Sequence, residues 1–397
     1  MLQNTEEKFI VIGNVFDNYF AIDVADFLEQ KPNITDLVSL KVFANSEFCP
    51  RFTLNENSID EKTGKSLSGK TVIIVSVHND WISRNEIAMR NLILTRAAKD
   101  NNAERVILVE PDLLYSAQDR GPGKEQGQTK QNRTPYDYYK FDGQAFTARL
   151  YAQLLKIAGI NTVITIHNHS YSCQHEYSKI FGNKGFINLF PDNLYHNYLC
   201  NSGIVDVFNT VLVAPDEGAW EFVRFTAESA EPFFPYIVFE KTRKDERSVS
   251  MKFSQKSQLS QNQIKGKDVV VLDDMVRTGS TIVNCCKLLK KYRPRKIIFA
   301  VTHFFSSDEI KRNLSGSCID EIITTNTIPN ILNRDHQGQL RKKMAVLKIN
   351  KWIANYLNSY LKLGLNIEYP LYKEDISDKN PRSKTTRKTF NHKSNNI

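Results

Sequence analysis

The segment of residues 269–281, VVVLDDMVRTGST, combines two carboxylates with a short run rich in hydroxyl groups. Its four leading apolar β-formers are typical of a parallel strand buried on both faces. Asp273 and Asp274 follow, and ligands of open α/β sheets bind just beyond the carboxyl ends of strands. Residues 278–281 then lead into a helical pattern, so their backbone N–H groups and hydroxyls can bind a phosphate. Two acids beside such a loop can accept hydrogen bonds from the hydroxyls of a ribose, or bind a Mg²⁺ that bridges those hydroxyls. The segment therefore predicts a sugar-phosphate site.

A capped helix after a strand is the simpler alternative for the same residues, because Thr and Ser are good N-caps. Paired acids before a TGST loop are much rarer than a simple cap, which favours the phosphate site. The loop is not of the Walker A type, because the lysine of that motif is absent.

Further β-type runs alternate with helical patterns along both halves of the chain, which predicts an α/β fold with mostly parallel sheets flanked by helices. The helical pattern at 144–159 is expected to turn Leu150, Leu154 and Leu155 to one face. The polar residues 121–132 are expected to form a mobile loop and the charged residues 240–248 a turn. The predicted strands are 9–13, 71–76, 105–111, 161–169, 211–214, 236–239, 268–274, 296–303 and 321–326, and the predicted helices are 21–30, 86–103, 144–159, 219–227, 282–292 and 344–361.

The length of 397 residues suffices for two to three domains, and 41% hydrophobic with 24% charged residues is typical of a soluble globular protein. We expect two α/β domains over residues 1–187 and 188–340, and a helix over 341–366 that packs back on the core. The formal net charge is +9, and residues 379–397 contain six basic and no acidic side chains. A basic, disordered tail over 367–397 is therefore predicted, rather than a nucleic-acid or membrane contact.

The cysteines and the N-terminus indicate a cytoplasmic protein. Six scattered cysteines include no CxxC pair, and the first residues lack the pattern of a secretory signal. No uncharged apolar stretch is long enough to span a membrane. The adjacent Cys285 and Cys286 fall in a helical pattern and are expected to be buried, inert thiols.

The acidic and hydroxyl-rich segment resembles the phosphoribosyl-diphosphate signature of type I phosphoribosyltransferases. From residue 8 to about residue 365 the chain is similar to the ribose-phosphate pyrophosphokinase (phosphoribosyl-diphosphate synthetase) family, as a divergent member. The matching motifs are FANSE (43–47), YSAQD (115–119), VITIHNH (163–169), NLFPDNL (188–194), APD (214–216), KTR (241–243) and TTNTIP (324–329).

This resemblance implies two similar phosphoribosyltransferase-type domains, the N-terminal one on the ATP side and the C-terminal one binding ribose 5-phosphate. It implies transfer of the diphosphoryl group of ATP, with Mg²⁺, to O1 of ribose 5-phosphate, and a homo-oligomer in which dimers build to hexamers. The implied residues are Phe43, Asn45, Glu47, Gln118 and Asp119 for ATP; Asp216, Asp273, Asp274, Arg277, Thr278, Gly279, Ser280 and Thr281 for ribose 5-phosphate; Lys241, Arg243 and His169 for catalysis; and His167, His169 and Asp216 for the metal.

Lys241 and Arg243 are assigned to catalysis because charge spreads over the oxygens of a transferring phosphoryl group and must be balanced by cations. In most proteins a segment such as residues 240–248 would be a solvated charged turn. The family resemblance favours the catalytic role.

His167 stands where the family has an aspartate. Mg²⁺ prefers oxygen ligands, so an imidazole here should weaken Mg²⁺ binding or favour Mn²⁺. Residues two apart in a strand share a face, so His167 and His169 are expected to converge on one ligand. A zinc site that adds Cys173 and His175 is the weaker alternative, because this spacing matches no common zinc pattern.

Three further differences from the family pattern concern positively charged side chains. Ala117 replaces an arginine on the ATP phosphates, for which Arg120 or Arg133 is expected to substitute. Thr242 replaces one of two catalytic-loop arginines, and Arg277 stands at a position that is often acidic. Two alternatives therefore stay open: a non-catalytic homologue that regulates a partner synthetase, and a phosphoribosyltransferase, which would need one α/β domain only.

Overall fold

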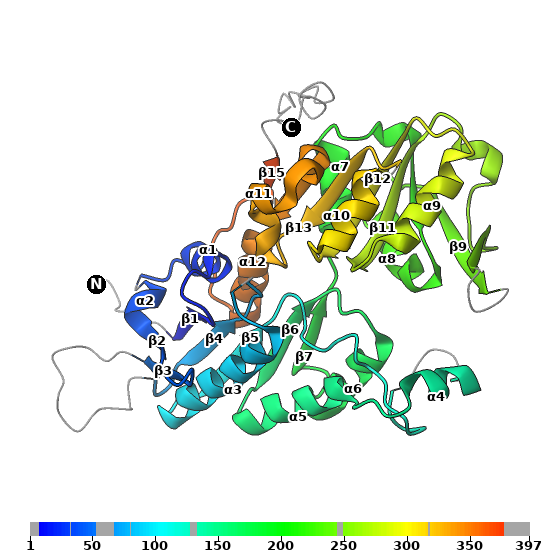
Figure 1. The fold of residues 1–397 in the computed structure, drawn as a ribbon. Coiled ribbons are helices and arrows are strands. Elements are labelled where there is room, and N and C mark those ends of the chain that lie inside the picture. Colours follow the sequence, from blue (N-terminus) through cyan, green and yellow to red (C-terminus); the bar gives the residue numbers. More distant parts are fainter. Residues whose placement is uncertain are drawn as a thin grey trace, which may run out of the picture. The chain divides into compact units, whose positions relative to one another are not determined.

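The structure is a computed structural model that describes residues 8–31, 33–52, 67–79, 81–127, 133–243, 249–316 and 318–376. The chain divides into two compact units (Figure 1). The first unit comprises Met1–Leu189, Thr327–Pro329 and Ile349–Leu371, and the second comprises Phe190–Asn326, Asn330–Lys348 and Tyr372–Ile397. Most of the predicted basic tail, from residue 377 onward, lies outside the described residues.

A five-stranded, wholly parallel sheet in the order β1-β4-β5-β6-β7 forms the centre of the first unit. A separate antiparallel hairpin is made by β2 and β3. The elements of this unit are β1 (Phe9–Gly13), α1 (Tyr19–Phe27), α2 (Ile34–Leu37), β2 (Val38–Val42), β3 (Phe48–Phe52), β4 (Thr71–Val75), α3 (Arg84–Asp100), β5 (Arg105–Val109), α4 (Pro135–Phe141), α5 (Thr147–Ala158), β6 (Thr162–Ile166), α6 (Tyr171–Phe181), β7 (Phe186–Leu189) and α12 (Asn350–Leu361).

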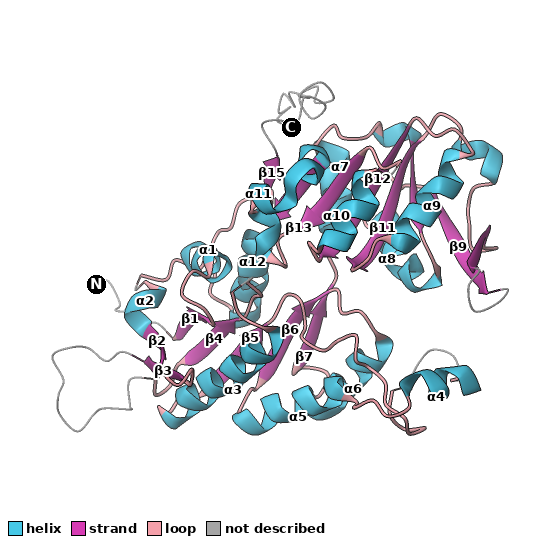
Figure 2. Ribbon diagram, viewed as in Figure 1, coloured by secondary structure: helices cyan, strands magenta, loops and turns pink. Residues whose placement is uncertain are grey.

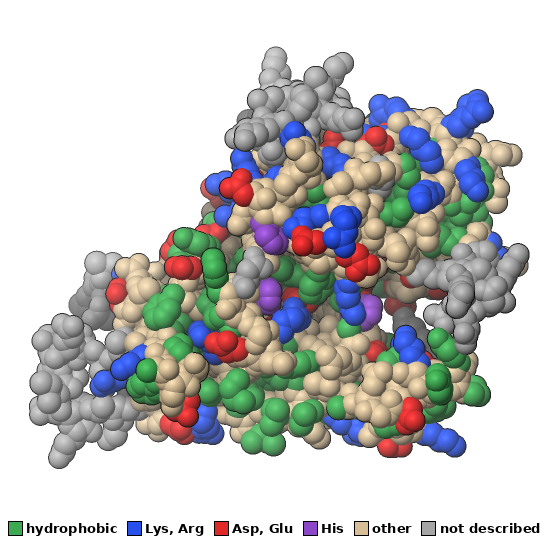
Figure 3. Space-filling view, in the orientation of Figure 1, with side chains coloured by type: hydrophobic (Ala, Val, Ile, Leu, Met, Phe, Trp, Pro, Cys, Tyr) green, Lys and Arg blue, Asp and Glu red, His purple; other side chains and the backbone are tan. Residues whose placement is uncertain are grey.

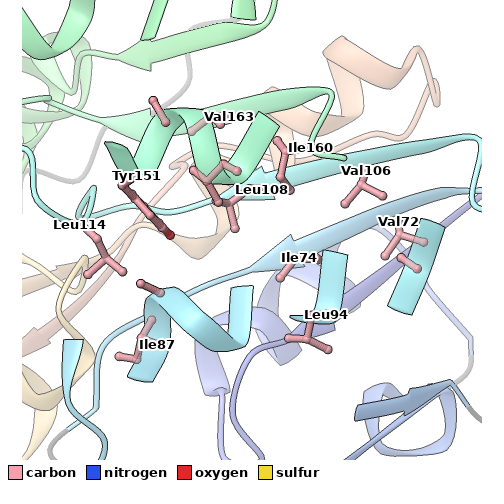
Figure 4. Packing of buried hydrophobic residues seen from close by; sticks show 14 of the residues in the cluster. Val72, Ile74, Ile87, Leu94, Val106, Leu108, Leu114, Tyr151, Ile160 and Val163 are labelled. Atoms are coloured by element: carbon pink, nitrogen blue, oxygen red, sulfur yellow. The ribbon is translucent and has the colours of Figure 1, made fainter. Parts of the chain in front are cut away.

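One face of this sheet is covered by α3, α5 and α6. Figure 4 shows alternate residues of the strands, such as Ile74 and Leu108, packed against Ile87 of α3 and Tyr151 of α5. Burying one such apolar side chain stabilises the fold by roughly 2 kcal/mol. The helix α12 packs against α1, and Asn350 Nδ2 donates a hydrogen bond to Asp23 Oδ2 at 3.1 Å. Residues from the end of the chain therefore belong to the N-terminal sheet domain.

The second unit contains an eight-stranded mixed sheet in the order β10-β9-β8-β11-β12-β13-β14-β15. Its central strands are parallel, and the edge strands β10 and β15 pair antiparallel. The helices and strands, coloured by type in Figure 2, are α7 (Asp192–Asn201), β8 (Thr210–Ala214), α8 (Trp220–Glu228), β9 (Tyr236–Arg243), β10 (Val249–Phe253), β11 (Asp268–Val276), α9 (Ser280–Lys290), β12 (Lys296–Phe304), α10 (Asp308–Ser315), β13 (Glu321–Thr325), α11 (Arg334–Gln337), β14 (Met344–Lys348) and β15 (Lys373–Ile376).

Several local predictions were wrong. The pattern at 344–361 contains a strand, β14, before α12, because its first residues pair with β13 inside the sheet. In α5 the leucines do not share a face: Leu155 is fully buried, whereas Leu150 and Leu154 are 50% and 38% exposed. Five residues on a helix span about 500°, which turns Leu155 well away from Leu150. Within the described residues, no helix is long and apolar enough to cross a bilayer.

Candidate functional site

The carboxyl ends of three neighbouring parallel strands bring the predicted sugar-phosphate residues together. In this register β8 ends at Ala214 while its partner β11 continues to Val276. Asp273 and Asp274 therefore lie beyond the last residue pair shared by the two strands, Val271 and Val213, beside the loop that carries Asp216. The strand is two residues longer than predicted, because it keeps its pairing with β12 as far as Val276 and Phe304.

Asp216, Asp273 and Asp274 lie close enough for their negative charges to repel one another, and they are called the acidic cluster here. Burial, and next the negative charges of Asp274 and Asp216, raise the pKa of Asp273 well above its usual value. Backbone N–H groups hold the acids in place: Asp274 N donates to Asp273 Oδ1 at 3.0 Å, and Met275 N donates to Asp274 Oδ1 at 2.7 Å. Asp216 Oδ1 accepts from Gly218 N at 3.0 Å. Because the three carboxylates repel one another, a bound cation or hydroxyl groups that donate hydrogen bonds would stabilise them.

Residues 278–281, which are predicted to bind a phosphate and are called the phosphate loop here, lead directly into α9. Gly279 is the N-cap of this helix, with a φ of 80° that an L residue adopts only with strain. Thr278 and Ser280 are exposed, and their hydroxyl oxygens are 3.3 Å apart. The backbone N–H groups of the first helical turn have no partner within the helix and are available to an anion.

Side chains of the next helix support this loop, and sequence reasoning missed them. Asn313 Nδ2 of α10 donates to Thr278 O at 2.7 Å, and Ser307 Oγ donates to Arg277 O at 3.3 Å. Arg277 itself is exposed, with Nη2 at 3.2 Å from Met275 Sδ. No sequence signal indicates these contacts, because about thirty residues separate the partners.

Lys241 and Arg243 belong to a strand and not to the predicted turn. Here β9 continues to Arg243 because it pairs antiparallel with β10, Lys241 opposite Met251 and Arg243 opposite Val249. The last pair of β9 with β8 is Val238 with Ala214. Since β8 and β9 are parallel, residues 241–243 extend past the same sheet edge as the acidic cluster. The connection 244–248 lies outside the described residues.

In the first unit the predicted adenine-binding residues occupy the tip of the β2–β3 hairpin. Phe43, Asn45 and Glu47 are all exposed. Phe43 N donates to Glu47 O at 2.9 Å, and Glu47 N donates to Asn45 Oδ1 at 3.2 Å, which closes the turn. The ring of Phe43 is 43% exposed and lies 4.8 Å from Lys41 Nζ. An exposed aromatic ring beside a cation is suited to stack on a base.

Gln118 and Asp119 lie against the start of α6. Ser172 Oγ donates to Asp119 O at 2.5 Å, which ties this segment to the residues directly after His167 and His169. Gln118 is exposed and Asp119 is buried, so Gln118 is the better placed of the two for a ligand contact. The structure therefore brings Gln118, Asp119 and the histidine segment together within the first unit.

Arg120 and Arg133 were expected to replace the arginine that is missing at Ala117, but both bind Asp137 instead. Arg120 Nη1 lies 2.6 Å from Asp137 Oδ1, and Arg133 Nε lies 2.8 Å from Asp137 Oδ2. The helix α4, which the sequence did not predict, supplies this carboxylate. Two arginines that share a carboxylate are held in position, so neither is free to take over the role of the missing arginine without breaking an ion pair.

The expectation that His167 and His169 share a strand face was wrong. The strand β6 ends at Ile166, and His167 has a φ of 46°, so the alternation of a strand stops there. His167 is 5% exposed, whereas His169 is exposed. Cys173 is buried in the hydrophobic core. Within the described parts of the chain, no three His, Cys, Asp or Glu side chains form a group that could hold a metal.

Glu110 is a buried acid that the sequence did not single out. Asn91 Nδ2, Tyr151 OH and Leu114 N donate to its carboxyl oxygens at 2.8, 3.1 and 3.0 Å. Burial raises the pKa of Glu110 to about 7. Glu110 follows β5, and an apolar strand that ends in an acid was the signal that could have indicated it.

We expect Glu110 to make the first unit less stable as the pH rises. The unfolded chain loses this proton near pH 4.3, whereas the folded chain keeps it up to about pH 7. The free energy of unfolding should therefore fall from about pH 4.3 to about pH 7 and lie roughly 3 to 4 kcal/mol lower above pH 7. Urea unfolding at several pH values should show this slope for the wild type and equally for Glu104→Gln, at an exposed residue just before β5, but a flatter curve for Glu110→Gln. Equal slopes in all three proteins would contradict the prediction.

Comparisons with known proteins agree with this geometry. Residues 28–159 match the N-terminal domain of ribose phosphate pyrophosphokinase, and residues 201–330 match the phosphoribosyl transferase domain. Ribose-phosphate pyrophosphokinase 2 of Saccharomyces cerevisiae is 26% identical over 78% of this chain and 87% of its own length. A ribose-phosphate pyrophosphokinase of Corynebacterium glutamicum is 25% identical over 84% of this chain and 87% of its own length.

The same fold is found in a solved structure. The phosphoribosylpyrophosphate synthetase of Mycobacterium smegmatis superimposes with a TM-score of 0.67, at 23% identity, over 90% of this chain and 100% of that protein. Together the two domain matches cover about two thirds of the sequence, and each falls largely in one of the two sheet-containing units. A single-domain phosphoribosyltransferase does not account for the N-terminal match. The chain belongs to the ribose-phosphate pyrophosphokinase family.

Proposed function

We propose that the protein is a ribose-phosphate diphosphokinase, which transfers the diphosphoryl group of ATP to O1 of ribose 5-phosphate and forms phosphoribosyl diphosphate and AMP for nucleotide biosynthesis. One observation carries the proposal: the acidic cluster, the phosphate loop and the strand with Lys241 and Arg243 all lie at one edge of the sheet in the second unit. The acidic cluster suits the hydroxyls of a sugar, and the phosphate loop suits a phosphate. The two cations suit a phosphoryl group during its transfer.

Ribose 5-phosphate is held at both ends in this proposal. The N–H groups of residues 278–281 bind the 5-phosphate at the N-terminus of α9, and Arg277 adds a positive charge. Asp273 and Asp274 accept hydrogen bonds from the ribose hydroxyls, with Asp216 beside them. Fixing both ends orients O1 for attack, and such positioning supplies most of the catalysis in phosphoryl transfer.

ATP is assigned to the first unit. Phe43, Asn45 and Glu47 at the hairpin tip bind the adenine, with Gln118 and Asp119 on the nucleotide. Lys241 and Arg243 of the second unit neutralise the charge that spreads over the transferring oxygens. We assign His169, the exposed histidine after β6, to the same reacting group.

A divalent cation, Mg²⁺ or Mn²⁺, fits the donor set in part. The mutual repulsion of Asp216, Asp273 and Asp274 is what a cation would relieve, and carboxylate oxygens suit a hard ion. The described residues offer no complete metal site of three side chains. The ion would therefore take most of its ligands from phosphates and water, as Mg²⁺ commonly does. Asp216 is the candidate ligand of the second unit, and for the first unit the family resemblance implies His167 or His169, which do not share a face. When bound, it neutralises charge on the phosphates.

His167→Asp should shift the metal preference towards Mg²⁺. An aspartate tolerates the positive φ of residue 167, so the change should not unfold the loop. We expect the ratio of Mg²⁺-supported to Mn²⁺-supported activity to rise about tenfold, because a carboxylate replaces an imidazole. The assay titrates both ions against the wild type and against His175→Asp on α6 as the control. An unchanged ratio would remove His167 from the metal site.

A catalytically inactive homologue that regulates a partner synthetase is the alternative. It is favoured by the ion pairs that hold Arg120 and Arg133 on Asp137 while Ala117 brings no charge. The purified protein is incubated with ATP, ribose 5-phosphate and a panel of divalent ions, and mass spectrometry follows the products. Equal amounts of AMP and phosphoribosyl diphosphate support the synthetase, and no product with any ion supports the inactive homologue.

A homo-oligomer in the cytoplasm completes the proposal. The outer face of α5 presents Leu150, Leu154 and Ile157, which are 50%, 38% and 77% exposed. Hydrophobic side chains gather over α3 and α5 in Figure 3. A contiguous apolar face suits a second copy of the chain. All six cysteines are free thiols.

A further inference from the structure

Three cysteines lie in or against the hydrophobic core of the second unit. Cys285 and Cys286 of α9 are fully buried in its hydrophobic core, and the half-buried Cys318 packs against the same core from the segment after α10. The thiols of Cys286 and Cys318 are hydrogen-bonded to each other. They are separated by 32 positions in the sequence, so the fold alone brings them into contact.

The surroundings give the two thiols opposite properties. The hydrogen bond from Cys286 lowers the pKa of Cys318 to about 6, burial opposes this shift, and Lys290 favours the thiolate. The same hydrogen bond, together with burial, raises the pKa of Cys286. At neutral pH one sulfur is therefore a partly accessible thiolate and the other a protonated thiol in contact with it. A nucleophilic thiolate beside a resolving thiol is the arrangement of a redox-sensitive pair.

We propose that Cys286 and Cys318 form a reversible disulfide when the protein meets a peroxide. The Cys318 thiolate attacks one oxygen of hydrogen peroxide, and with one proton taken up this gives a sulfenic acid and one water. The Cys286 thiol then attacks the sulfenic sulfur, the S–S bond forms, and a second water leaves. In total two thiols are oxidised and one peroxide is reduced to two waters. A dithiol reductant reverses the reaction by thiol exchange.

This disulfide would act on the phosphate loop, a consequence that rests on the proposed function. Cys286 lies less than two turns after Ser280, where α9 begins, and Cys318 follows α10, whose Asn313 holds Thr278 O at 2.7 Å. Hydrogen-bonded sulfurs must approach to about 2 Å to form the bond. The required movement of α9 against α10 alters the positions of the loop N–H groups, so oxidation should weaken phosphate binding.

Peptide mapping tests the disulfide without any assay of activity. Trypsin should release residues 278–287, TGSTIVNCCK, and residues 313–334, which contain Cys318. After a graded series of hydrogen peroxide, mass spectrometry should find these two peptides linked, and dithiothreitol should separate them. If Cys318 instead oxidises to a sulfinic acid, or stays reduced while the exposed Cys49 is oxidised, the proposal is overturned.

Three variants identify the partners. Cys318→Ser and Cys286→Ala should each abolish the linked peptide, whereas Cys285→Ala is the matched control and should keep it. The half-buried Cys318 tolerates substitution best, so its variant carries the test if Cys286→Ala fails to fold. A linked peptide that persists without Cys286, but not without Cys285, would overturn the assignment.

Calorimetry with ribose 5-phosphate tests the regulatory consequence. We expect the peroxide-treated wild type to bind about tenfold more weakly than the reduced protein, with recovery after dithiothreitol, and Cys318→Ser to be insensitive to peroxide. Equal affinity of the oxidised and reduced forms would overturn the regulatory effect. The linked peptide and the binding constant are measured without turnover, so a failure of the proposed function remains distinguishable from a failure of this one.

Discussion

Lys241→Ala should lower kcat roughly 10³-fold while the affinity for ribose 5-phosphate stays within about twofold of the wild type. The residue lies three positions beyond Val238, the last partner of β9 on β8, so its backbone extends past the sheet edge that holds the acidic cluster. A cation there can balance the charge of the transferring group, which develops chiefly in the transition state. Loss of such a cation affects kcat and leaves the bound sugar phosphate unchanged.

Steady-state assays of AMP formation give kcat, and calorimetry gives the affinity for ribose 5-phosphate. The matched control is Lys252→Ala on the neighbouring strand β10, where Lys252 Nζ pairs with Glu240 Oε2 at 3.1 Å. We expect this variant to keep kcat within about twofold, since exposed ion pairs contribute little. Equal losses in both variants would show that the hairpin responds to any loss of positive charge and that Lys241 has no special role.

The regular elements of both sheets could largely be predicted, because their strands are short apolar runs bounded by polar residues. The strand predicted at 268–274 and the helix predicted at 282–292 correspond to β11 and α9 within a few residues. The position of the proposed sugar-phosphate residues at one edge of the second sheet could be predicted for the same reason, since the carboxyl ends of neighbouring parallel strands must meet there. Periodicity and topology together were sufficient there.

Features that depend on pairing across the chain could not be predicted. Residues 240–243, which were expected to lie in a turn, belong to the strand β9, because β10 offers a partner that the charged sequence of β9 does not reveal. The helix α4 carries Asp137, which pairs with both Arg120 and Arg133, and the sequence did not indicate that these two arginines would be held there. His167 does not continue the strand, because its φ is positive, and the alternation of apolar and polar residues in the sequence does not predict such a backbone conformation.

Gly279→Ala should raise the KM for ribose 5-phosphate roughly 10 to 100-fold and leave the KM for ATP unchanged. At a φ of 80°, an added Cβ would lie 3.2 Å from Leu314 Cδ2 of α10. Either the loop or Leu314 must move, and Asn313, the neighbour of Leu314, fixes Thr278 O at 2.7 Å. The N–H groups that bind the phosphate then shift, because they belong to the residues around Gly279.

Gly266→Ala separates this effect from simple backbone strain. Gly266 precedes β11 and has a φ of 76°, but an added Cβ there meets nothing within 4 Å. Both variants should lose about 1–2 kcal/mol of stability, because an alanine at either position adopts a left-handed conformation. Only Gly279→Ala should change the KM for ribose 5-phosphate, in assays at saturating ATP. A similar rise in both variants would mean that strain anywhere in the second unit impairs the site, and the phosphate loop would lose its assignment.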